Sequence, residues 1–394
     1  ALLAVKELAD IFTIVSMTYE KDGHTLGGTP PQSALITLQS LGADAVGCNC
    51  SAGPEQMIDL VAAMQPYATV PLLAKPNAGM PKLSGGQTIF EMDAKTFASF
   101  GASLVRTGAN MLGGCCGTTP EHIRALARAI GRRKPVPPPR QSISALSSAR
   151  GFLEIRDNEP LYLVGERINP TGKKALQEEL RAGSMETVRR MAREQEEAGA
   201  DLLDVNVGVP GIDEVKTVRE VIGSVISVTA LPLVIDSSRV ETIEAALRLY
   251  PGRALINSIS GERDKLDRLL PLAARYGAMF ILLPLKGREV PETFEERREI
   301  VREVLKEAKR YGLTKEDAVV DALVMTAASR PAAPRETLRT VEWCARSLRC
   351  RTVVGLSNVS FGLPERRWIN GAFLAMAQTL GLTMAIANPW QEEL

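Results

Sequence analysis

Leu202-Leu203-Asp204-Val205-Asn206-Val207 is a short apolar run that ends on polar residues, and runs of this type set the architecture of the second half of the chain. Seven further runs occur between residues 158 and 394, with amphipathic stretches of helical periodicity between them. The eight predicted strands cover 162–165, 202–207, 233–236, 254–257, 279–283, 319–322, 352–356 and 383–387. Short apolar strands that alternate with helices indicate a parallel sheet, and eight such units predict a complete (β/α)8 barrel.

Polar side chains stand at the carboxyl ends of several of these strands. They are Asp204, Asn206, Asp236, Asn257, Asp321 and Asn358. Any one of them could simply cap the helix that follows its strand. Six at successive strand ends are harder to explain by capping, and catalytic residues of such barrels lie at this end. The sequence therefore predicts a polar site at the mouth of this barrel.

Residues 1–131 contain only four predicted strands, at 12–19, 43–50, 71–77 and 102–108, with helices expected at 32–41, 54–63, 94–100 and 120–130. Four βα units are half of a barrel. We therefore expect the first domain to be the last four units of a barrel whose opening four are absent, and the last helix of the second barrel to be absent too. The predicted fold class is α/β, with two tandem (β/α)8 barrels of the TIM type.

A proline-rich and serine-rich segment separates the two halves. Arg132-Arg133-Lys134-Pro135-Val136-Pro137-Pro138-Pro139 is typical of polyproline structure, and a Ser/Ala-rich stretch follows at 142–148. We place the interdomain linker at 132–157, between domains at 1–131 and 158–394.

The composition excludes several classes of partner. The 394 residues include 47 basic and 46 acidic side chains, which gives no electrostatic reason to expect nucleic acid or an anionic membrane as a partner. No apolar run reaches the roughly 18 residues of a membrane span, and residues 1–7 are typical of an amphipathic helix, not of a signal peptide. Six cysteines are too few for a disulfide scaffold, so we expect a reducing, cytoplasmic location.

The run Gly113-Gly114-Cys115-Cys116-Gly117-Thr118-Thr119-Pro120 carries the most informative chemistry of the first domain. Two adjacent thiols on a glycine-rich turn do not readily bond to each other, but they can bind one soft cation together. With a third thiolate from elsewhere they form a three-sulfur zinc site with one open position, as catalytic zinc requires. Such a site suits activation of an exogenous thiol, because a coordinating thiol loses its proton. Cys344 and Cys350 are expected to be packing or surface cysteines.

Two groups of motifs carry a family resemblance. Gly47-Cys48-Asn49-Cys50 with Ser51-Ala52-Gly53-Pro54-Glu55, together with the Gly-Gly-Cys-Cys-Gly-Thr run, resembles the C-terminal half of the homocysteine S-methyltransferase domain. Five further motifs resemble the pterin-binding methyltetrahydrofolate domain: the segments 165–172, 204–206, 235–237, 257–261 and 355–364. The tandem is similar to the N-terminal module of the cobalamin-dependent methionine synthase family.

The resemblance implies a 5-methyltetrahydrofolate–homocysteine S-methyltransferase of methionine biosynthesis, with zinc held by Cys50, Cys115 and Cys116. Cys48 is a rival ligand, because strand alternation puts positions 48 and 50 on one face. Cys50 is preferred because it ends the strand. Cobalamin would be supplied by a domain or corrinoid protein outside this chain, and homocysteine and methyltetrahydrofolate would be the substrates.

In the second barrel, the donor and acceptor edge of a pterin needs a carboxylate that accepts two N–H groups. Asp321 and Asp236 are the candidates, with Asn257 beside them. Asn358 can bond to N5 of the folate without carrying charge, and Asp204 would orient a water relay to that nitrogen. The remaining pterin-binding candidates are Asn206, Glu166, Asn169, Arg366 and Arg367. The two arginines either hold the glutamate tail of the folate or are solvated charges.

Asp22-Gly23-His24-Thr25-Leu26-Gly27 matches a cobalt-ligating pattern of one class of cobalamin domain, but the further signatures of that domain are not found. We interpret the match as chance, and we expect His122 to be exposed and not a ligand. Two alternative functions stay open. One is a folate–corrinoid protein methyltransferase with a degenerate first domain, and the other is a non-enzymatic protein that binds zinc and folate.

Overall fold

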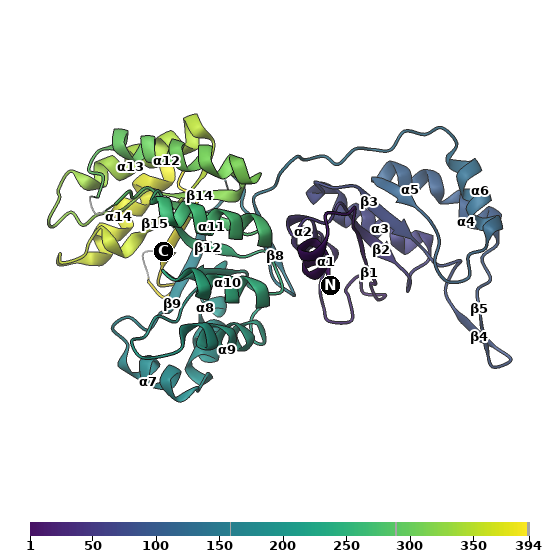
Figure 1. Ribbon diagram of the computed structural model, residues 1–394, viewed down its shortest axis with the longest axis horizontal. Helices are drawn as coiled ribbons and strands as arrows, with labels where there is room; N and C mark the ends of the chain where they lie inside the picture. Colours follow the sequence, from purple (N-terminus) through teal and green to yellow (C-terminus); the bar gives the residue numbers. More distant parts are fainter. Residues whose placement is uncertain (158, 288–289, 392–394) are drawn as a thin grey trace. The chain divides into compact units, whose positions relative to one another are not determined.

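The computed structural model describes residues 1–157, 159–287 and 290–391. The chain divides into two compact units. The first comprises Ala1–Ile143 with Ala149–Phe152, and the second comprises Ser144–Ser148 with Leu153–Leu394. Each unit has its own parallel sheet (Figure 1).

The first unit is built on a four-stranded parallel sheet in the order β1-β2-β3-β6. Its strands are β1 (Ile14–Met17), β2 (Ala45–Asn49), β3 (Leu72–Lys75) and β6 (Ala109–Leu112). Its helices are α1 (Leu2–Leu8), α2 (Pro31–Ser40), α3 (Pro54–Met64), α4 (Ala94–Ser99), α5 (Gly101–Thr107) and α6 (Pro120–Ile130), and a hairpin of β4 (Lys82–Ser84) and β5 (Gln87–Ile89) follows β3. Neighbours in the sheet follow chain order, which is the arrangement expected of half a barrel.

The strand predicted at 102–108 is wrong: this segment is helix α5, and the fourth strand is the next one, β6. The buried residues of α5 are Gly101, Leu104 and Val105. Leu104 and Val105 follow Gly101 by three and four residues, which is the spacing of one helix face. In so short a segment, two adjacent apolar residues do not distinguish a helix from a strand. Gly108 ends the helix at φ 119°, where a side chain would be strained.

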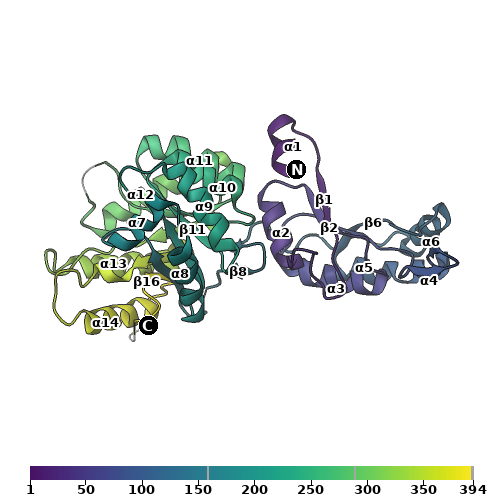
Figure 2. The ribbon, with the colours of Figure 1, turned by 90° about the horizontal axis from the view of Figure 1, so that it is seen from below.

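The second unit is a closed eight-stranded parallel barrel, as the sequence predicts. The strands are β9 (Tyr162–Ile168), β10 (Leu202–Asn206), β11 (Leu233–Asp236), β12 (Leu255–Ser260), β13 (Met279–Leu283), β14 (Ala318–Asp321), β15 (Arg351–Gly355) and β16 (Met384–Ala387). The helices are α7 (Lys174–Ala182), α8 (Glu186–Glu197), α9 (Glu214–Ile226), α10 (Val240–Leu249), α11 (Arg263–Tyr276), α12 (Phe294–Ala308), α13 (Ala333–Trp343) and α14 (Arg366–Thr379). They surround the strands (Figure 2), and pairing of β16 with β9 closes the barrel.

Alternation along the barrel strands separates a dry interior from a polar mouth. The apolar interior cluster includes Val164, Leu202, Val234, Leu255, Val319 and Val353. Two residues further along their strands, the same inward face carries Glu166, Asp204, Asp236, Asn257 and Asp321. The carboxyl end of the barrel is therefore lined with polar groups above a packed floor.

A short hairpin closes the amino end of this barrel. It consists of β7 (Ala145–Ser147) and β8 (Phe152–Glu154). Leu146 is fully buried within the interior cluster of the barrel. Tyr250 Oη donates to the carbonyl of Ser147 (2.9 Å), and Arg253 NH1 donates to that of Ala145 (3.0 Å). The segment predicted as a linker at 132–157 thus contains a folded element that packs in the second unit.

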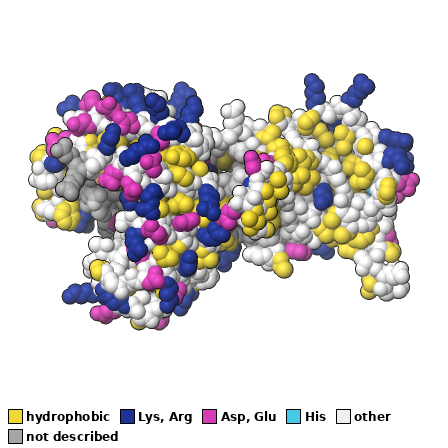
Figure 3. Space-filling model, viewed as in Figure 1, with side chains coloured by type: hydrophobic (Ala, Val, Ile, Leu, Met, Phe, Trp, Pro, Cys, Tyr) yellow, Lys and Arg dark blue, Asp and Glu magenta, His cyan; other side chains and the backbone are white. Residues whose placement is uncertain are grey.

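Charged side chains of both signs are mixed on the face of the second unit shown in Figure 3. This fits the balanced charge of the sequence. Within the described part of the chain, no helix combines the length and the hydropathy that crossing a membrane would require.

Candidate functional site

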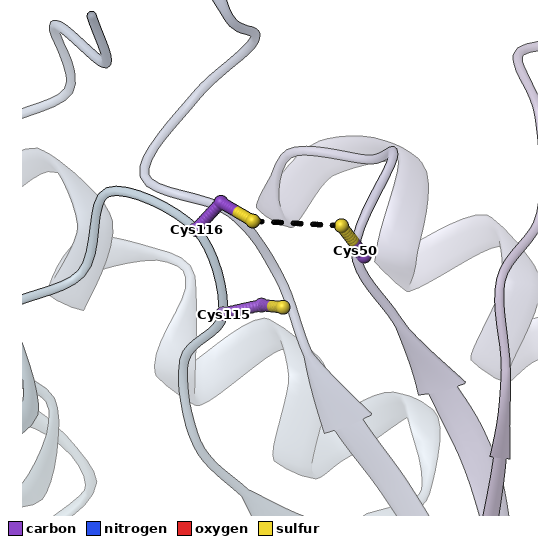
Figure 4. A group of neighbouring side chains, drawn as sticks. All are labelled: Cys50, Cys115 and Cys116. Atoms are coloured by element: carbon purple, nitrogen blue, oxygen red, sulfur yellow. Dashed lines mark hydrogen bonds between the residues drawn. The ribbon is translucent and has the colours of Figure 1, made fainter. Parts of the chain in front are cut away.

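Three cysteines from two loops meet at the carboxyl end of the first sheet (Figure 4). Cys50 directly follows β2, and Cys115 and Cys116 lie in the loop between β6 and α6. Cys50 Sγ and Cys116 Sγ are 3.6 Å apart, and all three sulfur atoms lie within 4.8 Å of one another. Tetrahedral zinc with Zn–S bonds of about 2.3 Å places sulfur atoms roughly 3.8 Å apart, so the cluster fits zinc and leaves a fourth position for a ligand.

The backbone distinguishes Cys50 from its rival Cys48. Cys48 lies inside β2, fully buried, with its sulfur against Met57 Sδ. Cys50 follows the last strand residue and adopts a left-handed backbone with φ 61°, and Ser51 does the same at φ 48°. Strand alternation therefore ends before residue 50, and the expectation that both thiols share one face is wrong. Two consecutive left-handed non-glycine residues are a costly conformation of the kind found at functional sites.

Asn77, which the sequence analysis missed, connects the two cysteine loops. Its backbone N–H donates to the carbonyl of Ala52 (2.9 Å), and its Oδ1 accepts from the backbone N–H of Cys116 (3.0 Å). Asn77 is almost completely buried, and its amide also hydrogen-bonds with the Cys50 thiol. A polar residue just past a strand end was the available signal, the same one that singled out residues in the other barrel.

The thiols of the cluster influence one another's ionisation. Burial opposes ionisation of Cys50, but hydrogen bonds from the Ser51 N–H, from Cys116 and Cys115, and from the amide of Asn77 outweigh it and lower the pKa of the thiol. The hydrogen bond to Cys50, together with burial, raises the pKa of Cys116 to about 11. Without a metal, the cluster thus favours ionisation of one thiol. A bound divalent cation would supply the positive charge that stabilises all three cysteines as thiolates.

At the mouth of the second barrel, the inward polar residues form hydrogen-bonded pairs. Asn206 Nδ2 donates to Asp236 Oδ2 (2.9 Å) across β10 and β11, and Asn257 Nδ2 donates to Asp204 Oδ1 (3.1 Å). Asp321 accepts the backbone N–H of Leu323 at Oδ1 (2.8 Å). Each of these carboxylates keeps at least one acceptor position for a ligand.

Burial raises the pKa of every carboxyl group in this mouth. For Asp204 and Asp236 the rise is opposed by their amide partners and reinforced by neighbouring carboxylates. Burial raises the pKa of Asp321 to about 6, although the Leu323 N–H and the guanidinium of Arg297 act against the rise. Carboxyl groups with perturbed pKa values that gather in one place are typical of a binding or catalytic centre.

Basic groups surround Glu166. Burial raises the pKa of this carboxyl against the effects of Lys173, Arg167, a hydrogen bond from Ser357, and Arg366. Lys173 Nζ donates to the carbonyl of Arg167 (2.7 Å). The sequence analysis included neither Lys173 nor Arg167, although Arg167 stands within the motif at 165–172.

The remaining candidates lie toward the rim. Asn358 is exposed in the single turn Leu356–Asn358, and Asn169 Oδ1 accepts from the N–H of Thr171 in a local turn (2.9 Å). Arg366 donates to the carbonyl of Ser357 (2.7 Å), which orders its exposed side chain. The guanidinium of Arg367 lies 4.9 Å from the ring centre of Trp368.

The two histidines lie outside the three-cysteine cluster. His24 is half exposed in a loop and contacts Asp22. The expectation that His122 is exposed is wrong, because its ring is buried, with Nδ1 bonded to Thr119 and Nε2 to the carbonyl of Met92 (2.9 Å). Cys344 and Cys350 are both buried.

Comparisons with known proteins agree with this division of the chain. The homocysteine S-methyltransferase family matches residues 1–130, and the pterin binding enzyme family matches residues 165–388. The methionine synthases of Mycobacterium leprae and Mycobacterium tuberculosis are both 30% identical to the chain, in alignments 397 and 392 positions long that cover 95% and 94% of it. The chain spans about a third of each of these relatives, 33% and 32%.

Among solved structures, dihydropteroate synthase from Xanthomonas albilineans has a TM-score of 0.47 and 21% identity, covering 64% of this chain and 94% of that one. The corresponding enzyme from Thermus thermophilus has a TM-score of 0.47 and 22% identity, with coverage of 62% and 93%. The pterin binding enzyme family matches residues 165–388, which are more than half of the chain and include the barrel with the polar mouth. The chain therefore belongs to the pterin-binding enzyme family.

Proposed function

We propose that this chain is the two-substrate portion of a cobalamin-dependent methionine synthase, with a homocysteine site in the first unit and a methyltetrahydrofolate site in the second. The observation that carries the proposal is the presence in one chain of an intact three-sulfur cluster and of two hydrogen-bonded pairs of carboxyl and amide groups at a barrel mouth. The alignment with methionine synthases over nearly the whole chain supports it.

In the first site, Cys50, Cys115 and Cys116 would hold zinc. When bound, zinc supplies a Lewis acid that stabilises the thiolate of homocysteine at neutral pH, where a free thiol with a pKa of about 8.5 is mostly protonated. The chain's own contribution is geometric: the left-handed turn at Cys50 and the Asn77 contacts hold the two loops in register. Three negative sulfur ligands also keep the bound thiolate electron-rich and therefore nucleophilic.

In the second site, Asp321 and Asp236 would accept the N–H groups along the pterin edge, with Asn206 orienting the Asp236 carboxylate and Asn257 beside them. Glu166 and Asn169 complete this set on the β9 side. Methyl transfer from N5 needs positive charge or a proton on that nitrogen, because a neutral amine nitrogen is a better leaving group than its anion. Asn358 would bond to N5, and Asp204 would orient a water that delivers the proton.

The rim arginines belong to the same proposal. Arg366 and Arg367 are exposed on the first turn of α14, where carboxylates of a glutamate tail could reach them without entering the barrel. Cobalamin, held by a domain or corrinoid protein outside this chain, would supply a nucleophilic metal centre that carries the methyl group between the two sites.

Two other functions fit fewer of the observations. A folate–corrinoid protein methyltransferase with a degenerate first domain would not need three converging sulfur atoms. A non-enzymatic protein that binds zinc and folate would not need the raised pKa values of the carboxyl groups at the barrel mouth.

The two half-reactions test the proposal with free cobalamin as the methyl carrier. We expect the purified chain to transfer methyl from methyltetrahydrofolate to reduced cobalamin, and from methylcobalamin to homocysteine. Cys115→Ala should abolish only the second reaction, and Asp236→Ala should impair only the first, by weakening folate binding. Folate transfer without homocysteine methylation would favour the corrinoid protein methyltransferase, and binding of folate without any transfer would favour the non-enzymatic function.

A further inference from the structure

Arg297 is the largest fully buried side chain of the described residues, and it belongs to neither of the two candidate sites. It lies in the first turns of α12, on the outside of the barrel wall next to the loop that follows β14. Burying a guanidinium is costly unless its donors are paired and its charge is compensated. The contacts of Arg297 must therefore offset the cost of burying its charge.

The Nε of Arg297 donates to the carbonyl of Pro291 (3.3 Å), and its NH1 group is directed at the backbone of the loop after Asp321. Its NH1 group lies 3.0 Å from the carbonyl oxygen of Ala322 and 3.1 Å from that of Leu323, and it also contacts Thr337 Oγ1 (3.2 Å). Thr337 Oγ1 in turn donates to the same Leu323 carbonyl (3.0 Å). Two side chains from two different helices thus hold one backbone carbonyl.

Leu323 is the residue whose N–H holds Asp321. It adopts a left-handed backbone with φ 57°, which is unfavourable for a branched side chain and persists only where the surroundings enforce it. In this conformation its N–H donates to Asp321 Oδ1 (2.8 Å). The Ala322 carbonyl that Arg297 also holds shares one planar peptide unit with the Leu323 N–H, so this contact fixes the direction of the N–H that orients the carboxylate.

The charge of Arg297 also acts on this carboxylate. The acidic groups that face the guanidinium are Glu336, Asp321 and Glu296. Glu336 accepts the Phe294 N–H and pairs with Arg339, and Glu296 accepts the Thr293 N–H in the helix cap. Among the described residues, no carboxylate is hydrogen-bonded to Arg297, and its NH2 group has no partner. Of the facing carboxylates in the described part of the chain, Glu296 and Asp321 accept only backbone N–H groups, and Asp321 is the one at the barrel mouth.

We propose that Arg297 is the positioning residue of Asp321: it clamps the strained turn that orients the carboxylate and supplies the buried positive charge that keeps it ionised. The proposal rests on the function proposed above, in which Asp321 accepts N–H groups of the pterin. A protonated Asp321 would offer a donor where the pterin also has donors, so the charge state decides binding.

A second buried arginine provides a matched control. Arg253 lies at the amino end of the barrel, where it donates to the carbonyls of Ala145 and Gly277 and pairs with Asp317. Replacing it disturbs another buried guanidinium that donates to backbone carbonyls, at the end of the barrel opposite the polar mouth. Its variant therefore reports the general effect of losing such a group.

The test compares Arg297→Gln, Arg297→Lys and Arg253→Lys in the full chain, with methyltetrahydrofolate affinity measured by titration calorimetry from about pH 5 to pH 8.5. In the unsubstituted protein, binding should weaken as the pH falls through about 6, the pKa of Asp321. Arg297→Gln should move this midpoint upward by about one pH unit. Arg297→Lys keeps the charge but loses the fork of donors, so it should keep the midpoint and weaken binding about tenfold at every pH. Arg253→Lys should change neither.

An unshifted midpoint in Arg297→Gln, or full affinity in Arg297→Lys, would overturn the proposal. If Arg297→Gln does not fold, the affinity and midpoint of Arg297→Lys decide. If the unsubstituted chain binds no methyltetrahydrofolate at any pH, the proposed function fails, but the role of Arg297 is still tested by carboxyl carbon NMR. The aspartate signal that is absent in Asp321→Asn should then titrate at a higher pH in Arg297→Gln.

Discussion

At the end of β2, two cysteines separated by one residue occupy different environments. Cys48 completes the packing of the first unit, whereas Cys50 leaves the strand through a left-handed turn and meets Cys115 and Cys116. The difference is one of backbone conformation and not of residue type. It follows that substitutions at these two positions should affect different properties.

We expect the purified chain to bind one zinc ion, and Cys116→Ala to lose it, because two sulfur ligands bind zinc far less tightly than three. Cys48→Ala is the control: it should keep full zinc content and lose about 1 kcal/mol of stability by leaving a small cavity. Metal analysis and X-ray absorption measure both. An absorption spectrum with only nitrogen and oxygen around the metal would contradict the three-sulfur site.

Asn358 differs from the pterin carboxylates because it is exposed and uncharged. If it engages N5 mainly as charge develops there, Asn358→Ala should lower the single-turnover rate of methyl transfer more than it weakens folate binding. Asp236→Ala should instead weaken binding itself, by about 1–3 kcal/mol, because pterin N–H groups lose their acceptor. Equal effects of Asn358→Ala on rate and affinity would mean that this side chain only binds.

The ionisation of Asp321 affects the stability of the folded protein as well as the binding site. Its pKa of about 6 in the folded protein exceeds the ordinary value of 3.8, so the folded state holds the proton more tightly than the unfolded state. The stability gained from the neutral acid is complete below the unfolded pKa and is lost as the pH rises through about 6. Asp321→Asn stays neutral, and should raise the free energy of unfolding by on the order of 3 kcal/mol above pH 7 or so.

Urea unfolding at about pH 7.5 and about pH 4 measures this effect, and the gain should be absent at the lower pH. Asp201 provides the comparison, since its pKa is also raised by burial but it lies at the amino end of β10 and binds the Leu163 N–H. Asp201→Asn should leave folate binding intact. A gain of Asp321→Asn that persists at low pH would assign the effect to packing and not to charge.

At the scale of elements, the hairpin β7–β8 is part of the second barrel although it precedes the first barrel strand. Leu146 fills the floor of the barrel beneath the apolar layer, and Ser147 exchanges hydrogen bonds with the backbone of Arg253. The hairpin therefore shields the apolar interior from solvent at the amino end of the barrel. The polar mouth at the other end is left as the accessible one.

Leu146→Ala should therefore destabilise the second unit by about 2–5 kcal/mol, because the cavity it leaves lies in a packed interior that cannot collapse onto it. Leu249→Ala is the matched control, since Leu249 is 46% exposed at the end of α10 and should cost little. Denaturant unfolding measures both free energies. Equal costs for the two leucines would show that the hairpin is not part of the folded barrel.

At the scale of the whole molecule, the chain consists of two units, each with its own sheet and core. A fragment of residues 144–394 should fold and bind methyltetrahydrofolate, whereas 158–394 lacks the hairpin and should unfold at lower denaturant. Circular dichroism and folate titration of both fragments test this. Failure of a well-folded 144–394 fragment to bind folate would mean that the folate site needs the first unit.

Periodicity and residue type were sufficient to predict the eight barrel strands, the polar residues at their ends and the cysteine pair, because these depend on local alternation and on chemistry at fixed sequence positions. The tertiary structure decided the rest. The helix at 101–107 resembles a strand in a short window. The strand end favours Cys50 over Cys48 in the sequence, but the two left-handed residues that take Cys50 out of the strand are seen only in the structure. Asn77 stands just past a strand end, but its contacts and those of Arg297 join segments far apart in the chain, which no local pattern encodes.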